Sequence, residues 1–157
     1  MKCRPSWLLN GLLLLLLTAQ GPVWSEESAF TFQKNVMIPM RDGVELAANI
    51  FLPQGDGPFP AILIRSPYGK SDEKHGDGIK YASAGYAFII QDCRGKGDSK
   101  GVWDPFRYDP QDGYDTQDWI SKQSWSNGKI GTMGGSYVGY TQWAPAPFKH
   151  PALKAMV

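Results

Sequence analysis

One serine lies in a segment whose composition suits nucleophilic chemistry. Ser136 follows Gly134 and Gly135 directly after a short apolar run, and Gly139 comes three residues later. A serine at a sharp strand-to-helix turn with glycine beside it forms the nucleophile elbow of G-x-S-x-G enzymes, where a strained backbone exposes the hydroxyl. Here Val138 occupies the position of the second glycine. The segment predicts Ser136 as a nucleophile, with a flexible glycine-rich turn as the alternative.

Such a serine also needs hydrogen-bond donors for the oxyanion that forms during its reaction. Each donor is worth about 3–4 kcal/mol of transition-state stabilisation. One usual donor is the backbone N–H after the nucleophile, which here belongs to Tyr137. The other comes from the loop after the third strand, where Tyr68 offers a phenolic hydroxyl next to the stiffening Pro67. Tyr68 is therefore a candidate donor, with a tyrosine that only packs in its loop as the alternative.

The sequence assigns no general base to this serine. In this type of enzyme the order along the chain is Ser, then Asp or Glu, then His, yet no Asp or Glu follows Ser136. His150 stands beside Pro151 and is expected at the surface, whereas His75 lies upstream in a polar segment. We therefore expect the chain to be an N-terminal fragment, inactive alone, whose base and orienting carboxylate lie beyond Val157.

The elements that must position these residues alternate between strands and helices. Asp42-Gly43 between two apolar runs is typical of a β-hairpin, and continuously apolar runs are typical of strands buried in a parallel sheet. The expected strands span residues 30–39, 44–52, 61–65, 86–91, 129–133 and 153–157, and the expected helices span residues 79–84, 109–123 and a segment from Gly134 to about Trp143. The pattern predicts an α/β fold with a mostly parallel sheet and an antiparallel N-terminal hairpin, truncated before its last strands.

The other charged segments are interpreted as structural. Helical spacing favours capping and dipole charges over a calcium site for four acidic residues: Asp109, Asp112, Asp115 and Asp118. A buried structural ion pair is expected among three residues: Asp92, Arg94 and Asp98. Gly95-x-Gly97 lacks the helix that follows a dinucleotide-binding loop. These segments therefore predict neither a metal site nor a cofactor site.

The N-terminus is predicted to be a secretory signal peptide. Lys2 and Arg4 precede an apolar run from Leu8 to Leu17, and small residues at Val23 and Ser25 suit signal peptidase. The run is about half as long as the roughly 20 apolar residues of a membrane helix. We expect cleavage after Ser25, a secreted or periplasmic protein, and no stable membrane insertion afterwards. The chain then divides into residues 1–25 and 26–157.

Composition excludes several classes of protein. The sequence is 42% hydrophobic and 20% charged, which argues against a disordered chain or a coiled coil. A net charge of +1 gives no basic surface for a nucleic-acid partner. Removal of the signal peptide would leave Cys93 as the remaining cysteine, expected to be buried as a small hydrophobe and not to act as a catalytic thiol.

Six ordered motifs connect these residues to a known family. They are Met40-Arg41-Asp42-Gly43-Val44-Glu45-Leu46, Arg65-Ser66-Pro67-Tyr68-Gly69-Lys70, Gln91-Asp92-Cys93-Arg94-Gly95-Lys96-Gly97-Asp98-Ser99, Gly113-Tyr114-Asp115-Thr116, Trp125-Ser126-Asn127-Gly128-Lys129 and Gly134-Gly135-Ser136-Tyr137-Val138-Gly139. On these motifs the chain resembles the CocE/NonD hydrolases, which are cocaine-esterase-like and Xaa-Pro dipeptidyl-peptidase-like serine hydrolases. The resemblance extends from about Asn35 to Val157.

The resemblance implies an α/β-hydrolase core with a Ser-Asp-His triad. Within this chain it implies Ser136 as nucleophile, and the Tyr68 hydroxyl and Tyr137 N–H as oxyanion hole. It implies ester or amide substrates, including Xaa-Pro peptides, and no metal or organic cofactor. It also implies a lid and a jelly-roll domain further along the chain. Pro145 and Pro147 depart from the pattern, because they should end or kink the elbow helix near Trp143.

Two functions are therefore carried forward from the sequence. The first is a secreted serine hydrolase that cleaves small-molecule esters or amide and peptide bonds through Ser136. The second is a non-catalytic binding or scaffold protein that keeps a hydrolase fold without its triad. The residues that follow Val157 would separate the two, because only an enzyme requires an Asp and a His there.

Overall fold

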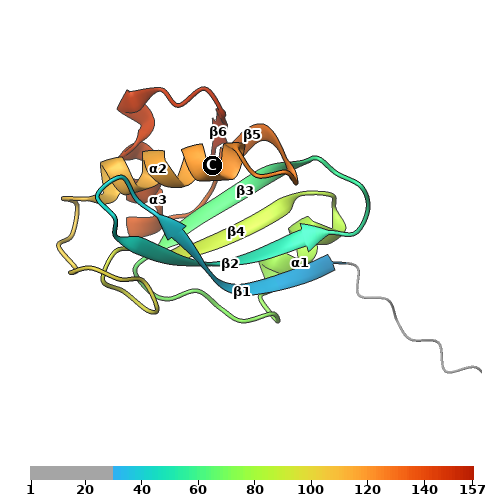
Figure 1. Ribbon diagram of the computed structural model, residues 1–157, viewed down its shortest axis with the longest axis horizontal. Helices are drawn as coiled ribbons and strands as arrows, with labels where there is room; N and C mark the ends of the chain where they lie inside the picture. The colour runs from blue at the N-terminus through green and yellow to red at the C-terminus, as the bar shows by residue number, and fades with distance from the viewer. Residues whose placement is uncertain (1–29) are drawn as a thin grey trace, which may run out of the picture.

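Two apolar strands, β3 (Phe59–Ser66) and β4 (Ala87–Asp92), lie at the centre of the sheet in the computed structural model, which describes residues 30–157 (Figure 1). Within these residues the sheet has six strands in the order β1-β2-β4-β3-β5-β6. Every residue of β4 is buried, as a strand covered on both faces requires. The predicted signal peptide at residues 1–25 lies outside the described residues.

The N-terminal strands form the predicted antiparallel hairpin. β1 (Phe30–Pro39) pairs with β2 (Glu45–Pro53), and β2 also pairs antiparallel with β4. Gly43 closes the turn with a φ of 84°, where glycine has no steric penalty. The Asp42 carboxylate accepts a hydrogen bond from the Val44 N–H at 3.1 Å. The hairpin signal in the sequence was therefore sufficient to locate this element.

The remaining strands are parallel. β3 pairs with β4 on one side and with β5 (Ser126–Thr132) on the other, and β6 (Leu153–Met156) pairs with β5 at the edge of the sheet. β5 begins three residues before the predicted start at residue 129, because Ser126 already pairs with Phe59. The mostly parallel sheet with an antiparallel hairpin is thus as predicted.

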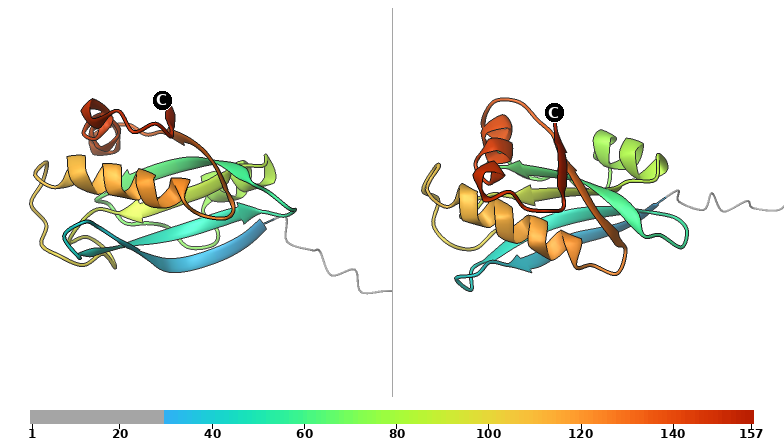
Figure 2. Two further views of the ribbon diagram at one scale, coloured as in Figure 1. Left: turned by 45° about the horizontal axis from the view of Figure 1, so that its top comes forward. Right: turned by 90° about the horizontal axis from the view of Figure 1, so that it is seen from above.

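Helices lie on both faces of this sheet (Figure 2). α2 (Asp109–Ser121) covers one face and α1 (Gly76–Ser83) covers the other. Under α2 the core contains Ile38, Leu46, Ile50, Leu63, Ile89, Ile120 and Ile130. Under α1 it contains Phe51, Ala82, Phe88 and Ile90. Both layers bury apolar side chains of the same strands, so the sheet is packed on both faces.

The segment after β5 contains the short helix α3 (Tyr137–Trp143) and a 3-10 turn, η1 (Ala146–Phe148). Pro145 comes directly before η1, and α3 ends at Trp143 as its prolines predicted. α1 begins three residues before its predicted start at residue 79, because the His75 side chain accepts a hydrogen bond from the Gly78 N–H at 3.2 Å. Histidine is not among the usual capping residues, so no local sequence signal indicated this start.

The expectation for His150 is wrong. The side chain is buried, not on the surface, with 6% of the residue exposed. Its Nδ1 accepts a hydrogen bond from the Ala152 N–H at 3.2 Å, and the ring of Tyr114 packs edge-on against it. The connection between η1 and β6 folds back onto α2, which the neighbouring proline did not indicate.

Candidate functional site

The turn between β5 and α3 holds Ser136 in a strained conformation. Its φ and ψ are 56° and −131°, in a region that residues with a Cβ atom rarely adopt. The residue is exposed to solvent. A serine with this backbone projects its hydroxyl away from the chain on both sides, as a nucleophile elbow requires.

Two glycines allow the strand and the helix to approach each other at this turn. Gly134 has a φ of 134°, and a Cβ atom there would lie 2.3 Å from the Val138 Cγ1. A Cβ atom on Gly139 would lie 3.3 Å from the Gly134 carbonyl oxygen. The departure from G-x-S-x-G therefore has a physical explanation. Val138 packs over Gly134. The residue that approaches the Gly134 carbonyl oxygen closely is Gly139, one position later.

Gln142 fixes the turn from the opposite side of α3. Its side-chain amide donates to the carbonyl oxygens of Gly134 and Val157, each at 2.9 Å, and its oxygen accepts from the Thr132 hydroxyl at 2.9 Å. The residue is buried. Gln142 thus joins the end of β5, the turn and the residue after β6. Sequence reasoning missed this role, since a glutamine within a helix carries no signal of such a bond.

Tyr68 lies at the same edge of the sheet as Ser136. β3 and β5 are parallel neighbours with Leu63 opposite Thr132, so the loop that follows β3 and the turn that follows β5 leave the sheet together. Tyr68 is 71% exposed as a residue, and its backbone N–H donates to the Ser66 hydroxyl at 3.0 Å. The structure therefore brings the two candidates to one edge, with the phenol free to face a ligand.

A buried lysine ties the Tyr68 loop to the neighbouring strand. The Lys70 ammonium donates to Asp92 at 2.7 Å and to Asp98 at 2.6 Å, and 3% of its side chain is exposed. Gly97 permits this arrangement, because a Cβ atom there would collide with the Asp92 carboxylate. Asp92 and Asp98 therefore share Lys70 and do not pair with Arg94, which corrects the expected ion pair. The sequence offered no signal that Lys70 is their common partner.

Tyr137, the first residue of α3, has its side chain anchored at the tip. The hydroxyl donates to the Asp109 carboxylate at 2.6 Å and accepts from the Phe106 N–H at 3.0 Å. Burial and the bond to Asp109 raise the pKa of the phenol well above its usual 10.0. The backbone N–H of Tyr137 stands at the helix N-terminus, where no intrahelical acceptor exists. The residue thus combines a fixed side chain with an N–H next to Ser136.

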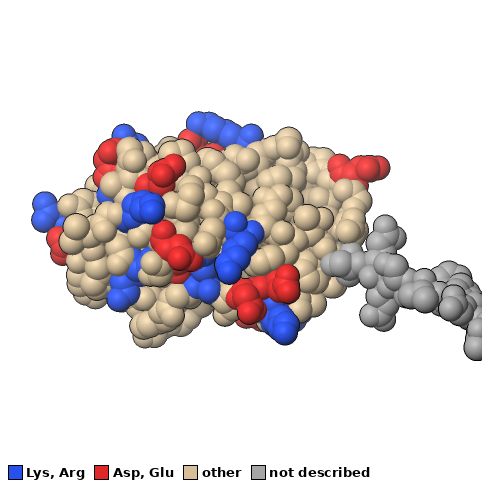
Figure 3. Space-filling model, turned by 60° about the horizontal axis from the view of Figure 1, so that its bottom comes forward, with Lys and Arg blue, Asp and Glu red and all other residues tan. Residues whose placement is uncertain are grey.

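The acidic residues of α2 form ion pairs with basic side chains, and the capping role expected at the start of this helix is not filled by Asp109. Tyr108, not Asp109, is the N-cap, and it makes no side-chain capping bond. The guanidinium of buried Arg65 contacts the Asp109 carboxylate at 3.5 Å, and Arg94 contacts Asp112 at 2.6 Å. Asp115 binds Arg41 at 2.7 Å and Asp118 binds Lys122 at 2.6 Å. Basic and acidic side chains also lie interspersed on the face shown in Figure 3. The four carboxylates are therefore partners in ion pairs.

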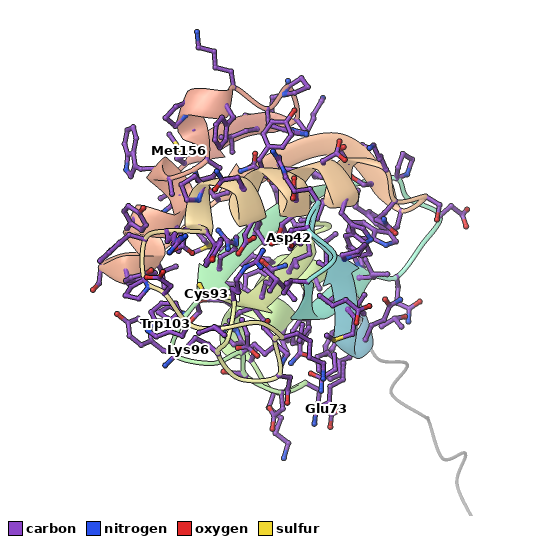
Figure 4. All side chains as sticks on the ribbon, turned by 60° about the vertical axis from the view of Figure 1, so that its left-hand side comes forward. Asp42, Glu73, Cys93, Lys96, Trp103 and Met156 are labelled. Atoms are coloured by element: carbon purple, nitrogen blue, oxygen red, sulfur yellow. The ribbon has the colours of Figure 1, made fainter. Side chains whose placement is uncertain are left out.

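Cys93 is the first residue of the loop that joins β4 to α2 (Figure 4). It is fully buried, and burial raises the pKa of its thiol to about 12. The thiolate needed for nucleophilic chemistry is therefore scarce at neutral pH. Further along the same loop, the Lys96 ammonium lies 5.1 Å from the centre of the Trp103 ring. The expectation of a buried, inert cysteine agrees with this environment.

Both histidines of the chain serve local structure. His75 caps α1 and packs beside Phe88, and His150 lies 3.8 Å from the Asp118 carboxylate. No cluster of three His, Cys, Asp or Glu that could hold a metal is present in residues 30–157. In the same part of the chain, no helix is both long and apolar enough to cross a membrane.

Comparisons with known proteins match this chain to hydrolases. The sequence profile of the family described as X-Pro dipeptidyl-peptidase (S15 family) matches residues 42–157. Cocaine esterase from Rhodococcus sp. (strain MB1 Bresler) is 41% identical over 132 residues, which cover 81% of this chain and 23% of the esterase.

Solved structures give the same result. An α-amino acid ester hydrolase superposes with a TM-score of 0.74 at 33% identity, over 94% of this chain and 28% of that protein. A CocE/NonD family hydrolase from Staphylococcus aureus gives a TM-score of 0.72 at 34% identity, over 81% of this chain and 27% of that protein. The predicted α/β-hydrolase fold is confirmed, and the chain spans about a quarter of the length of these relatives.

Proposed function

The chain belongs to the X-Pro dipeptidyl-peptidase (S15) family of hydrolases, and from this we propose that it carries the nucleophile and oxyanion hole of a serine hydrolase for ester or amide bonds. The resemblance to CocE/NonD hydrolases, inferred from six motifs, is confirmed by these relatives. Small-molecule esters and peptides with proline next to the cleaved bond are the substrate classes that we propose.

The observation that carries the proposal is the backbone of Ser136. A positive φ on a residue with a Cβ atom costs about 1–3 kcal/mol and persists where the surrounding structure enforces it. Gly134, Gly139 and Gln142 all act to keep this turn in place. The strain yields an exposed hydroxyl at the carboxyl edge of a parallel sheet, where α/β proteins bind their ligands.

In the proposed reaction, the Ser136 Oγ bonds to the substrate carbonyl carbon while its proton passes to a histidine base. The carbonyl oxygen becomes an oxyanion, which accepts hydrogen bonds from the Tyr68 hydroxyl and the Tyr137 N–H. Collapse of this intermediate breaks the ester or amide bond, and the leaving alcohol or amine takes the proton from the histidine. Water then releases the acid by the same steps and regenerates Ser136.

We propose that the base and its carboxylate come from residues beyond Val157 in the complete gene product. The two histidines of the chain are engaged in capping and packing, and the acidic residues of α2 are engaged in ion pairs. A serine without its base is a weak nucleophile. The 157-residue chain alone is therefore expected to be nearly inactive, in contrast to the complete gene product.

A fluorophosphonate probe tests the nucleophile, because it reacts with an activated serine. The complete gene product should be labelled at Ser136, as read by peptide mass spectrometry, and Ser136→Ala should abolish both labelling and hydrolysis of a p-nitrophenyl ester. Ser121→Ala is the matched control, since Ser121 lies on α2 and bonds to the Asp118 carbonyl. Unchanged turnover in Ser136→Ala would end the serine-hydrolase proposal in favour of a different catalytic group. Absence of labelling and turnover in the unaltered protein would favour the non-catalytic alternative.

We also propose that the protein is secreted or periplasmic. The support is the basic start at Lys2 and Arg4, the apolar run from Leu8 to Leu17 and the small residues before Glu26. Cleavage after Ser25 leaves only four residues before β1 begins at Phe30. The folded part would therefore start close to the new N-terminus.

A further inference from the structure

The Tyr137 side chain connects the start of α3 to a distant segment of the chain, the end of the loop before α2 and the first turn of that helix. Its hydroxyl bonds to Asp109 on α2 and to the backbone of Phe106 in the preceding loop. Its ring lies 5.1 Å from the Phe106 ring and 5.4 Å from the Trp103 ring, measured between centroids. A side chain held at both its ring and its tip has little freedom to rotate. The residue that begins α3 is therefore fixed by contacts outside its own helix.

Asp109 is itself held firmly enough to act as an anchor. Only 5% of the residue is exposed. Arg65, at the end of β3, donates to the Asp109 carbonyl oxygen at 2.9 Å and contacts its carboxylate at 3.5 Å. The Arg65 Nε also donates to the Gln91 side chain on β4 at 2.9 Å. The Tyr137 hydroxyl is thus connected through Asp109 to the two central strands of the sheet.

The backbone N–H of this same tyrosine is the proposed oxyanion donor next to Ser136. We propose that the Tyr137 hydroxyl and Asp109 are positioning groups, which orient that N–H toward the oxyanion. The inference rests on the proposed function, because it needs an oxyanion at Ser136. It assigns a task to the side chain of a residue whose proposed contribution to the site was so far only its backbone N–H.

The protonation of the phenol suits this task. Its raised pKa keeps the hydroxyl protonated throughout the neutral range, so that it remains a donor to the Asp109 carboxylate. A donor that is displaced from its acceptor loses part of its contribution in the transition state. Loss of the hydroxyl should therefore slow the chemical step and leave substrate binding nearly unchanged.

The test compares two tyrosines of the same helix in the complete gene product. Tyr137→Phe removes the hydroxyl that bonds to Asp109, whereas Tyr140→Phe removes a hydroxyl that bonds only to the Phe106 carbonyl oxygen, at 3.1 Å. With a p-nitrophenyl ester as substrate, Tyr137→Phe should lower kcat about tenfold and change KM less than about twofold. Tyr140→Phe should change both constants less than about twofold.

A double-mutant cycle identifies the path through Asp109. Asp109→Asn should lower kcat when Tyr137 is present. In the Tyr137→Phe variant it should cause little further loss of kcat, since both substitutions break the same hydrogen bond. Circular dichroism melts establish that each variant is folded at the assay temperature. A variant that does not fold counts against the inference, because its group would then serve folding and not positioning.

Three results would overturn the inference. The first is an unchanged kcat in Tyr137→Phe. The second is a loss of kcat in Tyr140→Phe as large as that in Tyr137→Phe. The third is a double variant whose loss of kcat equals the product of the losses in Tyr137→Phe and Asp109→Asn, because independent groups would act in that way. Ser136→Ala in the same assay separates this inference from the proposed function. An active Ser136→Ala refutes the proposed function, whereas an inactive Ser136→Ala beside a fully active Tyr137→Phe refutes the positioning role alone.

Discussion

At the scale of single residues, Tyr68 shows how an exposed side chain depends on a buried neighbour. The residue is 71% exposed, so packing does not hold its ring in place. The loop is instead held by the Lys70 ammonium between Asp92 and Asp98, and by the bond of the Tyr68 N–H to Ser66. Because the anchors act on the backbone, the ring can be changed without removing them.

Tyr68→Phe removes the phenolic donor and retains the ring. In the complete gene product we expect kcat to fall about 100-fold or more, because one oxyanion donor is lost. The measurement is steady-state hydrolysis of a p-nitrophenyl ester, with a thermal melt to establish folding. Tyr86→Phe is the control. Tyr86 is an exposed tyrosine directly before β4, and so it lies at the edge of the sheet opposite to the one that Tyr68 follows. A loss of less than about threefold would mean that Tyr68 only packs in its loop.

The sequence indicated candidate residues where the signal was local. Ser136 could be proposed because glycines flank it. Tyr68 could be proposed because it follows Pro67 in the loop after the third strand along the chain. The bond between Tyr137 and Asp109 joins residues 28 positions apart, and Lys70 binds an Asp 22 positions away. No periodicity encodes such pairs, so only the folded chain reveals them. His150 was misplaced for the same reason, since Tyr114, which lies on α2 and is 36 positions away, covers its ring.

At the scale of elements, α2 is attached to the hairpin and the sheet by charge. Arg94 donates to Asp112 at 2.6 Å and to Asp42 at 2.7 Å, and so connects the helix to the β1-β2 turn. Its side chain is 9% exposed and Asp112 is 1% exposed. A buried carboxylate that loses its partner is strongly destabilising. This ion pair therefore fixes α2, and with it the Asp109 end of the site.

Arg94→Met should destabilise the complete gene product by roughly 3 kcal/mol, because it removes the close partner of buried Asp112 and leaves only the Arg65 guanidinium, 4.0 Å away. Urea unfolding followed by circular dichroism measures the change. Arg107→Met is the matched control. Both guanidinium groups lie over the Tyr108 ring, at 4.6 Å for Arg94 and 5.4 Å for Arg107, but the Arg107 pair with Asp104 is exposed. The control should cost about 1 kcal/mol or less. Equal losses in the two variants would contradict the ion-pair explanation.

The destabilisation by Arg94→Met should also depend on pH. The hydrogen bond from Arg94 lowers the pKa of Asp42 below its usual 3.8. A carboxyl group whose pKa is lowered in the folded state stabilises the protein at pH values above its usual pKa. That stability is lost as the pH falls through the lowered pKa. The difference between the unaltered protein and Arg94→Met should therefore narrow below about pH 4.

Element types followed from the sequence, whereas element boundaries did not. The apolar runs identified β3 and β4, and the Asp-Gly turn identified the hairpin. β5 begins earlier than predicted because Ser126 pairs with Phe59, a contact between segments far apart in the sequence. The order of strands in the sheet could not be read either, since it depends on how β3 enters between β4 and β5.

At the scale of the whole molecule, the described residues match about a quarter of a longer chain in the relatives. The chain covers 23% of cocaine esterase and 28% of the α-amino acid ester hydrolase. Within the described residues, β6 forms one edge of the sheet. The other edge is β1, which begins at Phe30, just after the proposed cleavage site.

The proposed export predicts a specific mature N-terminus. If the basic and apolar start directs secretion, Edman sequencing of the exported protein should begin at Glu26. The host should be a secretion-competent cell that expresses the complete gene product. Replacing Leu13 and Leu14 with Arg should retain the protein in the cytoplasm, because the apolar run is interrupted. A protein that keeps Met1 and stays in the cytoplasm would refute secretion.

The strained turn at Ser136 gives catalytic activity at the expense of thermal stability. A glycine tolerates a φ of 56°, so Ser136→Gly should raise the melting temperature of the protein, as a calorimetric scan can measure, while removing the hydroxyl. A laboratory selection for heat tolerance alone would thus favour chains that have discarded their nucleophile. Directed evolution of this protein therefore needs turnover as part of the screen. A screen for stability on heating alone would select variants that relieve the backbone strain by replacing Ser136.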